Sequence, residues 1–457
     1  MRDLGSFRDP SGYIYYENDK VFRVVNKVYQ ENYDHLINSG LHDFLVQKND
    51  IVIHKIIKKE NYDTNQYCVL DTEKIEPIVY PYEWAFSQYK DAALLTLEIQ
   101  RNAIDYGMFL KDASPFNIQF KNNKPIFIDT LSFEKIKQDY SWKAYKQFCE
   151  MFLSPLCLMA FKDPELIKLL FGNINGISLE TTNKLLSLRN KLNFSVFLHL
   201  TLPNYLSKLN SDKISNNKKK KISKNQHLNI ISQLESFISS LNIIKEKSEW
   251  GEYNIETISE KKTYVIDKEN TINEFTKQLK FGLSWDIGSN DGYYSRYLAS
   301  KSSKMVYSFD IDWKCVEKNY LINRRNKVEN IVTILLDLTN PSPAIGWLNK
   351  ERKSIFDRIG SPNLICCLAI MHHLINANIP LSNLMDLLKK TLEYVIIEYI
   401  PIFDPKCEII FKTRDYNFNY PSKLEFEETL KRDFHIIRQK TLDQTDRELY
   451  LIRKIKI

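Results

Sequence analysis

The feature that most constrains the fold of this 457-residue chain is a short glycine-containing segment between a strand-like run and a helix-like run. The segment reads Asp286-Ile287-Gly288-Ser289-Asn290-Asp291-Gly292, and the helix is predicted to begin near Tyr294. Glycine lets the backbone approach a ligand closely at Gly288, and it permits tight packing at Gly292, where the loop meets the helix. Asp286 ends the strand, where its carboxylate can bind a cationic group directly or through water. The sequence therefore predicts a ligand-binding turn at the carboxyl end of a strand.

A second predicted strand follows the glycine segment and ends in an acid, Asp310. The spacing is close to the ~20 residues that separate a phosphate loop from a ribose-binding acid in dinucleotide folds. A carboxylate at Asp310 can accept hydrogen bonds from both hydroxyls of a ribose. Ile311 would then lie against an adenine face, and Asp312 is the alternative candidate for the ribose role.

Three further strands are predicted, over 331–336, 363–370 and 394–399, with helical sequence between the last two. The first ends in Asp337-Leu338, where an acid can accept the exocyclic amine of adenine. The second is almost wholly apolar, as expected of a parallel strand buried on both faces. Strands that alternate with helices predict a parallel, doubly wound α/β sheet. Such sheets bind ligands at the carboxyl ends of their strands, where the acids and glycines of this sequence fall.

From about Trp285 to Ile457 the chain resembles the class I S-adenosylmethionine-dependent methyltransferases. The resemblance implies a Rossmann-like sheet that binds S-adenosyl-L-methionine through Asp286, Gly288, Asn290, Gly292, Asp310, Ile311, Asp337 and Leu338. Asn290 stands where many members have a middle glycine, a departure that variants of the family tolerate. An NAD-binding domain is the competing interpretation, but the loop lacks the Gly-x-Gly-x-x-Gly spacing that such a domain would carry.

Two adjacent histidines, His372 and His373, follow the strand predicted over 363–370. In the catalytic interpretation, one of them faces the transferred methyl group and takes a proton from the acceptor. In the structural interpretation, both hold loop backbone through hydrogen bonds. Methyl transfer from a sulfonium needs mainly positioning and desolvation, so a dedicated base is optional.

Bulk properties restrict the remaining function classes. The formal net charge of +7 permits an acidic partner without requiring one. The seven cysteines show no zinc-ligand spacing, so no metal site is expected. The polar N-terminus and the lack of an apolar run of ~20 residues indicate a cytoplasmic protein with no membrane partner. The oligomeric state stays open.

Composition shifts near Leu209 and divides the chain into an N-terminal domain over 1–208, a linker with an amphipathic helix over 209–250, and a methyltransferase domain over 251–457. The linker carries the run Lys218-Lys219-Lys220-Lys221, which we interpret as a solvated inter-domain loop rather than a nucleic-acid contact. Leu228, Ile231, Leu234, Ile238 and Leu241 lie on one helix face. A helix of this kind commonly covers the sheet of the domain that follows.

The N-terminal half is predicted to be an α+β domain that serves substrate recognition. Asp112 and Asn117 match the Asp-x-x-x-x-Asn pattern of a kinase-like catalytic loop, and Asp129 follows as a metal-binding aspartate would. That resemblance implies Asp112 as the base and Asn117 and Asp129 as magnesium ligands, with Lys55 as the candidate lysine on the third strand. Leu110 replaces the usual histidine, and no glycine-rich loop is evident. The alternative is that Asp112 and Asn117 cap turns and Asp129 ends a strand.

Both halves together resemble a bacterial group of methyltransferases that includes nodulation proteins of the NoeA type. The stretches that carry this resemblance are 80–84, 110–114, 127–134 and 368–374. We therefore expect a methyltransferase whose acceptor is a small molecule or a saccharide. The alternatives are a bifunctional enzyme with an ATP-using kinase-like N-terminal domain and a nucleic-acid methyltransferase. No Asn-Pro-Pro-Tyr-type motif follows the fourth strand, which disfavours the nucleic-acid alternative.

Overall fold

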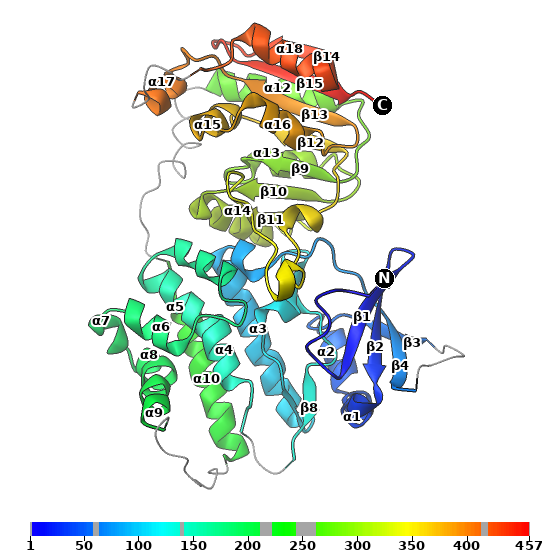
Figure 1. Ribbon diagram of the computed structural model, residues 1–457, viewed down its shortest axis with the longest axis vertical. Coiled ribbons are helices and arrows are strands. Elements are labelled where there is room, and N and C mark those ends of the chain that lie inside the picture. Colours follow the sequence, from blue (N-terminus) through cyan, green and yellow to red (C-terminus); the bar gives the residue numbers. More distant parts are fainter. Residues whose placement is uncertain are drawn as a thin grey trace. The chain divides into compact units, whose positions relative to one another are not determined.

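The computed structural model describes residues 2–57, 64–137, 141–210, 222–243, 262–412 and 419–456, and its elements are drawn in Figure 1. The chain forms two compact units. Unit 1 comprises Met1–Lys245 together with Pro343–Arg358, and unit 2 comprises Glu246–Ser342 and Ile359–Ile457. These limits differ from the boundaries at 208 and 251 expected from the sequence, and the second segment of unit 1 had no sequence signal. The lysine run 218–221 lies outside the described residues.

Unit 2 is built on a seven-stranded sheet. Its strands are β9 (Ser284–Ile287), β10 (Val306–Asp310), β11 (Ile331–Leu335), β12 (Leu364–Cys367), β13 (Tyr394–Tyr399), β14 (Phe434–Thr441) and β15 (Glu448–Lys454). Its described helices are α12 (Lys262–Thr276), α13 (Tyr293–Ala299), α14 (Trp313–Arg325), α15 (Met371–Asn376), α16 (Leu381–Leu388), α17 (Pro405–Phe411) and α18 (Lys423–Asp433).

The spatial order of the sheet is β11-β10-β9-β12-β13-β15-β14, and the strands from β11 to β13 are parallel. This confirms the predicted doubly wound sheet. The antiparallel pair β14–β15, which the sequence analysis did not predict, completes one edge. The chain order reverses direction between β9 and β12, and that switch point is where open sheets of this kind bind ligands.

The strand predicted over 363–370 is shorter than expected, because β12 ends at Cys367. Ala369 adopts a positive φ of 50°, which a β-strand does not accommodate. Cys366 and Cys367 are fully buried, in keeping with a central strand covered on both faces.

Alternate residues of a strand point to opposite faces, so β13 shows which helices cover each side. Ile396 belongs to a core cluster with Ile272 of α12, on one face of the sheet. Tyr399 lies on the other face, where its ring centroid is 5.1 Å from that of Phe426 in α18. Glu398 therefore points toward α12 from the same face as Ile396.

Unit 1 begins with a four-stranded antiparallel sheet of order β1-β2-β4-β3. All the described strands of unit 1 are β1 (Gly12–Glu17), β2 (Lys20–Asn26), β3 (His54–Ile57), β4 (Gln66–Thr72), β5 (Met108–Leu110), β6 (Ile118–Lys121), β7 (Lys124–Phe127) and β8 (Phe133–Lys135). The last four form two small pairs, β5–β8 and β6–β7. This α+β arrangement agrees with the expectation for the N-terminal half.

The described helices of unit 1 are numerous and mostly short. They are α1 (Gln30–Asn38), α2 (Leu41–Gln47), α3 (Phe86–Asp105), α4 (Tyr145–Phe148), α5 (Ser154–Phe161), α6 (Leu179–Leu185), α7 (Leu188–Lys191), α8 (Phe194–Val196), α9 (Leu202–Asn210) and α10 (Lys224–Ser240). None of the helices in the described part of the chain combines the length and apolar character that crossing a bilayer requires.

The amphipathic helix expected over 228–241 is present as α10, but it packs against α3 of unit 1 rather than covering the sheet that follows. Ile231, Leu234 and Ile238 are fully buried. Arg101 of α3 pairs with Glu235 of α10. Because α3 and α10 bury their apolar faces against each other, α10 is part of the core of unit 1 rather than of a linker.

The second segment of unit 1, Pro343–Arg358, lies between β11 and β12 in the sequence. Arg358 forms an ion pair with Glu83, and both side chains are almost fully buried. The guanidinium of Arg358 lies 3.9 Å from the ring centroid of Tyr80. These contacts fix the segment in unit 1, although the sequence around it belongs to unit 2.

Candidate functional site

A cavity of about 430 Å³ opens at the carboxyl ends of β9, β10, β11 and β12. This volume lies within the ~300–1,000 Å³ typical of small-molecule sites. The sequence-predicted residues that line it are Gly288, Asn290, Asp310, Ile311, Asp337, Leu338, His372 and His373. The fold thus brings together, around one cavity, residues that the sequence placed after four separate strands.

The glycine loop takes its shape from left-handed backbone conformations. Gly288 has φ of 70°, and a Cβ there would lie 2.7 Å from Cδ1 of Ile370, another cavity residue. Gly292 has φ of 78°, and its Cβ would lie 2.0 Å from Oδ1 of Asn319 in α14. Asn290 has φ of 50°, which asparagine tolerates better than most side chains. This tolerance explains how asparagine can occupy the expected glycine position.

Asp310 ties the loop to the end of β10. Its carboxylate accepts hydrogen bonds from the backbone N–H of Asn290 at 2.7 Å and of Asp312 at 2.9 Å. Burial raises the pKa of Asp310 to about 6. The carboxylate is therefore ionised above that pH and faces the cavity as an acceptor. Asp312, the alternative ribose acid, caps α14 by accepting from the N–H of Lys314 and is not among the residues that line the cavity.

The end of β11 supplies a second acid to the cavity. Asp337 accepts hydrogen bonds from the backbone N–H and the hydroxyl of Thr339, at 2.8 and 2.7 Å. Leu338 lines the cavity wall beside Asp337. Ile311, which follows β10, also lines the wall and is 55% exposed. An aromatic ring bound here would cover apolar surface that is otherwise open to water.

Two predicted residues do not line the cavity. Asp286 is 1% exposed and accepts a hydrogen bond from the hydroxyl of Ser295 in α13 at 2.5 Å. Burial raises the pKa of Asp286 to about 6. Gly292 lies at the start of α13, where it accommodates Asn319. The fold uses both residues to seat α13 on the sheet.

The two histidines lie in α15, with ring centroids 4.1 Å apart. His372 is 3% exposed, and burial, aided by the nearby His373 and Arg447, lowers its pKa to about 3. Its Nδ1 has no hydrogen-bond partner among the described residues. The imidazole is therefore neutral and packed in the cavity wall, with one buried nitrogen left without a partner among the described residues.

Sequence reasoning missed a buried charge network that forms part of the cavity wall. Lys268 of α12 donates to Glu398 of β13 at 2.5 Å, and the hydroxyl of Tyr264 donates to the same carboxylate at 2.9 Å. Arg447 makes two bonds to Asp404, at 2.7 and 2.9 Å. Lys268 and Arg447 also line the cavity. The available signal was Glu398 itself, since a charge within an apolar strand needs a partner.

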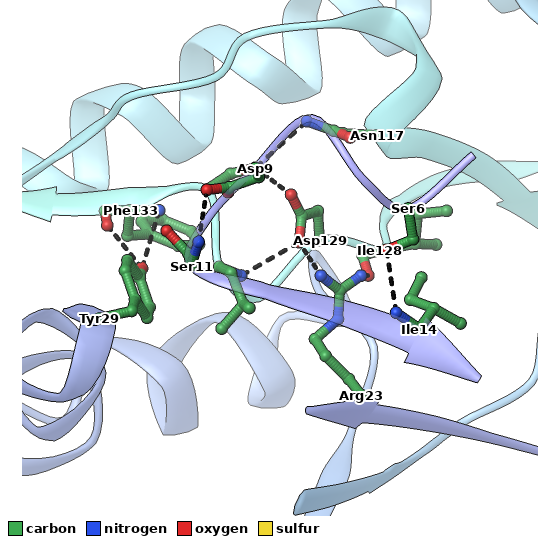
Figure 2. Close-up of polar contacts among 12 residues, drawn as sticks. Ser6, Asp9, Ser11, Ile14, Arg23, Tyr29, Asn117, Ile128, Asp129 and Phe133 are labelled. Carbon is green, nitrogen blue, oxygen red and sulfur yellow. Dashed lines mark hydrogen bonds and ion pairs between the residues drawn. The ribbon is translucent and has the colours of Figure 1, made fainter. Parts of the chain in front are cut away.

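The kinase-like motif of unit 1 forms a separate polar cluster, which Figure 2 shows in part. Arg23 of β2 is paired with Asp129, and the hydroxyl of Ser132 donates to Asp129 at 2.6 Å. Asp112 accepts from the side-chain amide of Gln147 at 2.7 Å and from the backbone N–H of Ser114 at 3.1 Å.

The proposed third-strand lysine is not part of this cluster. Lys55 lies on the edge strand β3 with an exposed side chain, whereas Arg23 reaches Asp129. Asn117 donates to the hydroxyl of Ser132 at 3.2 Å. Within the described ranges, no group of three or more His, Cys, Asp or Glu side chains is arranged to hold a metal ion.

The doubly wound sheet, the left-handed glycine loop and the acids at successive strand ends define the class I methyltransferase fold in unit 2. No protein-family model matches the chain. The chain is 29% identical over 473 aligned residues to the nodulation protein NoeA of Rhizobium meliloti, covering 99% of this chain and 96% of NoeA. The two proteins are therefore distant homologues over both units.

Solved structures similar to part of the chain include methyltransferases. The N-methyltransferase NodS from Bradyrhizobium japonicum, in complex with S-adenosyl-L-homocysteine, is 10% identical, with 46% of this chain and all of that chain covered and a TM-score of 0.33. The magnesium protoporphyrin IX methyltransferase from Synechocystis, with bound S-adenosylmethionine, is 14% identical, with 46% and 87% covered and a TM-score of 0.31.

Proposed function

We propose that unit 2 is an S-adenosyl-L-methionine-dependent methyltransferase whose acceptor is a small molecule or the end of a saccharide. The observation that carries the proposal is the arrangement around one cavity of Asp310, Asp337 and the Gly288 loop. The cavity volume of about 430 Å³ is in the range of sites that bind small molecules.

The cavity residues fit the proposed cofactor on chemical grounds. Asp310 is a buried carboxylate that can accept both ribose hydroxyls, and Asp337 can accept the adenine amine. Gly288 leaves space next to Ile370 that a side chain would fill. Ile311 and Leu338 supply apolar surface for the adenine ring.

The bound cofactor would supply a methyl group on a sulfonium, whose carbon an acceptor lone pair would attack in line while the bond to sulfur breaks and the neutral thioether leaves. This chain would then have to position the acceptor and exclude water. His372 is held neutral by burial, which lowers its pKa to about 3, so we assign it a positioning role in the cavity wall rather than that of a base. Lys268 is held by the carboxylate of Glu398 and Arg447 by that of Asp404, and these ion pairs fix this part of the cavity wall.

Isothermal titration with S-adenosyl-L-homocysteine tests the proposal. We expect micromolar binding to the intact chain and an affinity at least about 100-fold weaker in Asp310→Ala, because two hydrogen bonds to a charged acceptor are lost. The matched control is Asp312→Ala, which removes an acid two residues away that does not line the cavity. No binding to the unmodified protein, or equal losses in both variants, contradicts the proposed site.

The geometry favours methyl transfer over the kinase-like alternative. Asp129, the expected metal ligand, is already paired with Arg23, and Asp112 is held by Gln147. A magnesium ion would have to displace these contacts before it could bind. We therefore propose that unit 1 serves substrate recognition rather than phosphoryl transfer.

A further inference from the structure

The segment around α7 and α8 exposes an unusual amount of apolar surface. Five large apolar side chains within 13 residues are at least 40% exposed: Leu185 at 40%, Leu188 at 80%, Leu192 at 84%, Phe194 at 68% and Phe197 at 46%. We call them the apolar surface of unit 1. Packed monomers rarely expose large apolar side chains in such density unless the surface meets a partner.

Other residues of the same segment already supply its packing. Leu186, Val196 and Leu200 are buried at 3% exposure or less, so they anchor the segment in unit 1. The hydroxyl of Ser187 and the amide oxygen of Asn193 accept hydrogen bonds from the first turns of α7 and α8. The apolar surface therefore has no evident role in holding the segment folded. A helical segment that is apolar on both its inner and outer sides is expected to bury the outer side against something else.

The charges next to this surface are mainly positive. Residues 181–210 contain Lys184, Arg189, Lys191 and Lys208 and no aspartate or glutamate. Lys184 and Lys208 pair with Glu180. Arg189 is exposed and Lys191 is partly exposed, and neither makes an ion pair within the described part of the chain. They are neighbours in sequence of Leu188 and Leu192.

We propose that the apolar surface of unit 1 docks on an anionic lipid bilayer. Leucine and phenylalanine side chains enter the boundary between headgroups and acyl chains, while Arg189 and Lys191 contact lipid phosphates. Nucleic acid would satisfy the cations but would gain nothing from five exposed apolar side chains. An uncharged apolar partner would gain nothing from the cations. The expectation of no membrane partner came from the absence of a spanning segment, which does not bear on a surface of this kind.

Co-sedimentation of the full chain with vesicles tests the proposal. We expect binding to phosphatidylglycerol vesicles at low salt and much weaker binding to phosphatidylcholine vesicles. Leu188→Asp with Leu192→Asp should weaken the binding at least about tenfold, because apolar burial is lost and negative charge is added. Arg189→Glu with Lys191→Glu should weaken it by a similar factor, because each cation near an anionic surface contributes about fivefold.

The matched control is Leu392→Asp with Leu424→Asp, two exposed leucines of unit 2, at 56% and 65% exposure. This variant should bind vesicles as the unmodified protein does, and all variants should keep its melting temperature. No binding of the unmodified protein to phosphatidylglycerol overturns the proposal, as does unchanged binding in both surface variants. Self-association that Leu188→Asp with Leu192→Asp abolishes, without vesicle binding, would assign the surface to a second copy of the chain instead.

Discussion

Asp286 and Asp310 carry the same side chain at the ends of neighbouring strands, yet the fold gives them different surroundings. Asp286 faces α13 and bonds to Ser295, whereas Asp310 lines the cavity. Burial raises the pKa of each carboxyl to about 6. Of the two, only Asp310 could make the affinity for a cavity ligand depend on pH, because Asp310 lines the cavity and Asp286 does not.

We expect the affinity for S-adenosyl-L-homocysteine to fall about tenfold between pH 7.5 and pH 5, because most Asp310 carboxyls become protonated below a pKa of about 6. The protonated form loses acceptor capacity for the ribose hydroxyls. Ionisation of Asp310 has the opposite effect on the stability of the ligand-free protein: it raises the affinity for the ligand but lowers the free energy of unfolding. Since the pKa lies above the ordinary 3.8, the ionised carboxylate destabilises the protein without ligand as pH rises through 6. Titration calorimetry at both pH values measures the affinity. The Asp310→Asn variant should bind weakly, with an affinity that does not change with pH. Constant affinity in the unmodified protein would contradict the assignment.

At the scale of elements, α12 is held to β13 by a buried ion pair. Lys268 and Glu398 are 6% and 0% exposed at their side chains. Burial alone would raise the pKa of Glu398, but Lys268 and Arg447 beside it hold that pKa below its ordinary value. The pair therefore stays charged, and removal of one member leaves a buried charge without compensation.

Lys268→Met should lower the free energy of unfolding by about 3–5 kcal/mol, because Glu398 loses its principal partner. Glu398→Gln added to that variant should restore part of the loss, since the uncompensated charge is removed. Lys431→Met is the control, because Lys431 is exposed and forms an i,i+4 pair within α18 whose loss should change stability by about 0.5 kcal/mol or less. Urea unfolding measures all three variants. Equal effects of Lys268→Met and Lys431→Met would show that the buried pair contributes no more than a surface pair.

At the scale of the whole molecule, the chain leaves unit 2 after Ser342, contributes Pro343–Arg358 to unit 1 and then returns. Within unit 1, Arg358 neutralises the fully buried Glu83 and donates to the backbone oxygen of Ile78. Unit 1 is therefore incomplete as the continuous stretch 1–245.

A fragment of residues 1–245 should have a low melting temperature that rises when a synthetic peptide of residues 343–358 is added. The peptide binds the folded fragment and supplies the partner of Glu83, so stability increases with its concentration. The matched control is the same peptide with Arg358→Ala, which should give a much smaller shift in the melting scan. Equal shifts from both peptides would mean that Arg358 does not hold the segment.

The sequence by itself determined the parallel sheet of unit 2 and most of its cavity residues. Strand periodicity, a glycine loop and an acid at the strand end are local patterns, and the carboxyl ends of parallel strands necessarily meet at one edge. Only the tertiary structure decided which acids face the cavity, because helix packing directs Asp286 toward Ser295 and leaves Asp310 in the wall. The Lys268–Glu398 pair, the placement of Pro343–Arg358 in unit 1 and the apolar surface near α7 depend on contacts or exposure. Local sequence does not encode these features, because their partners are distant in the chain or are solvent.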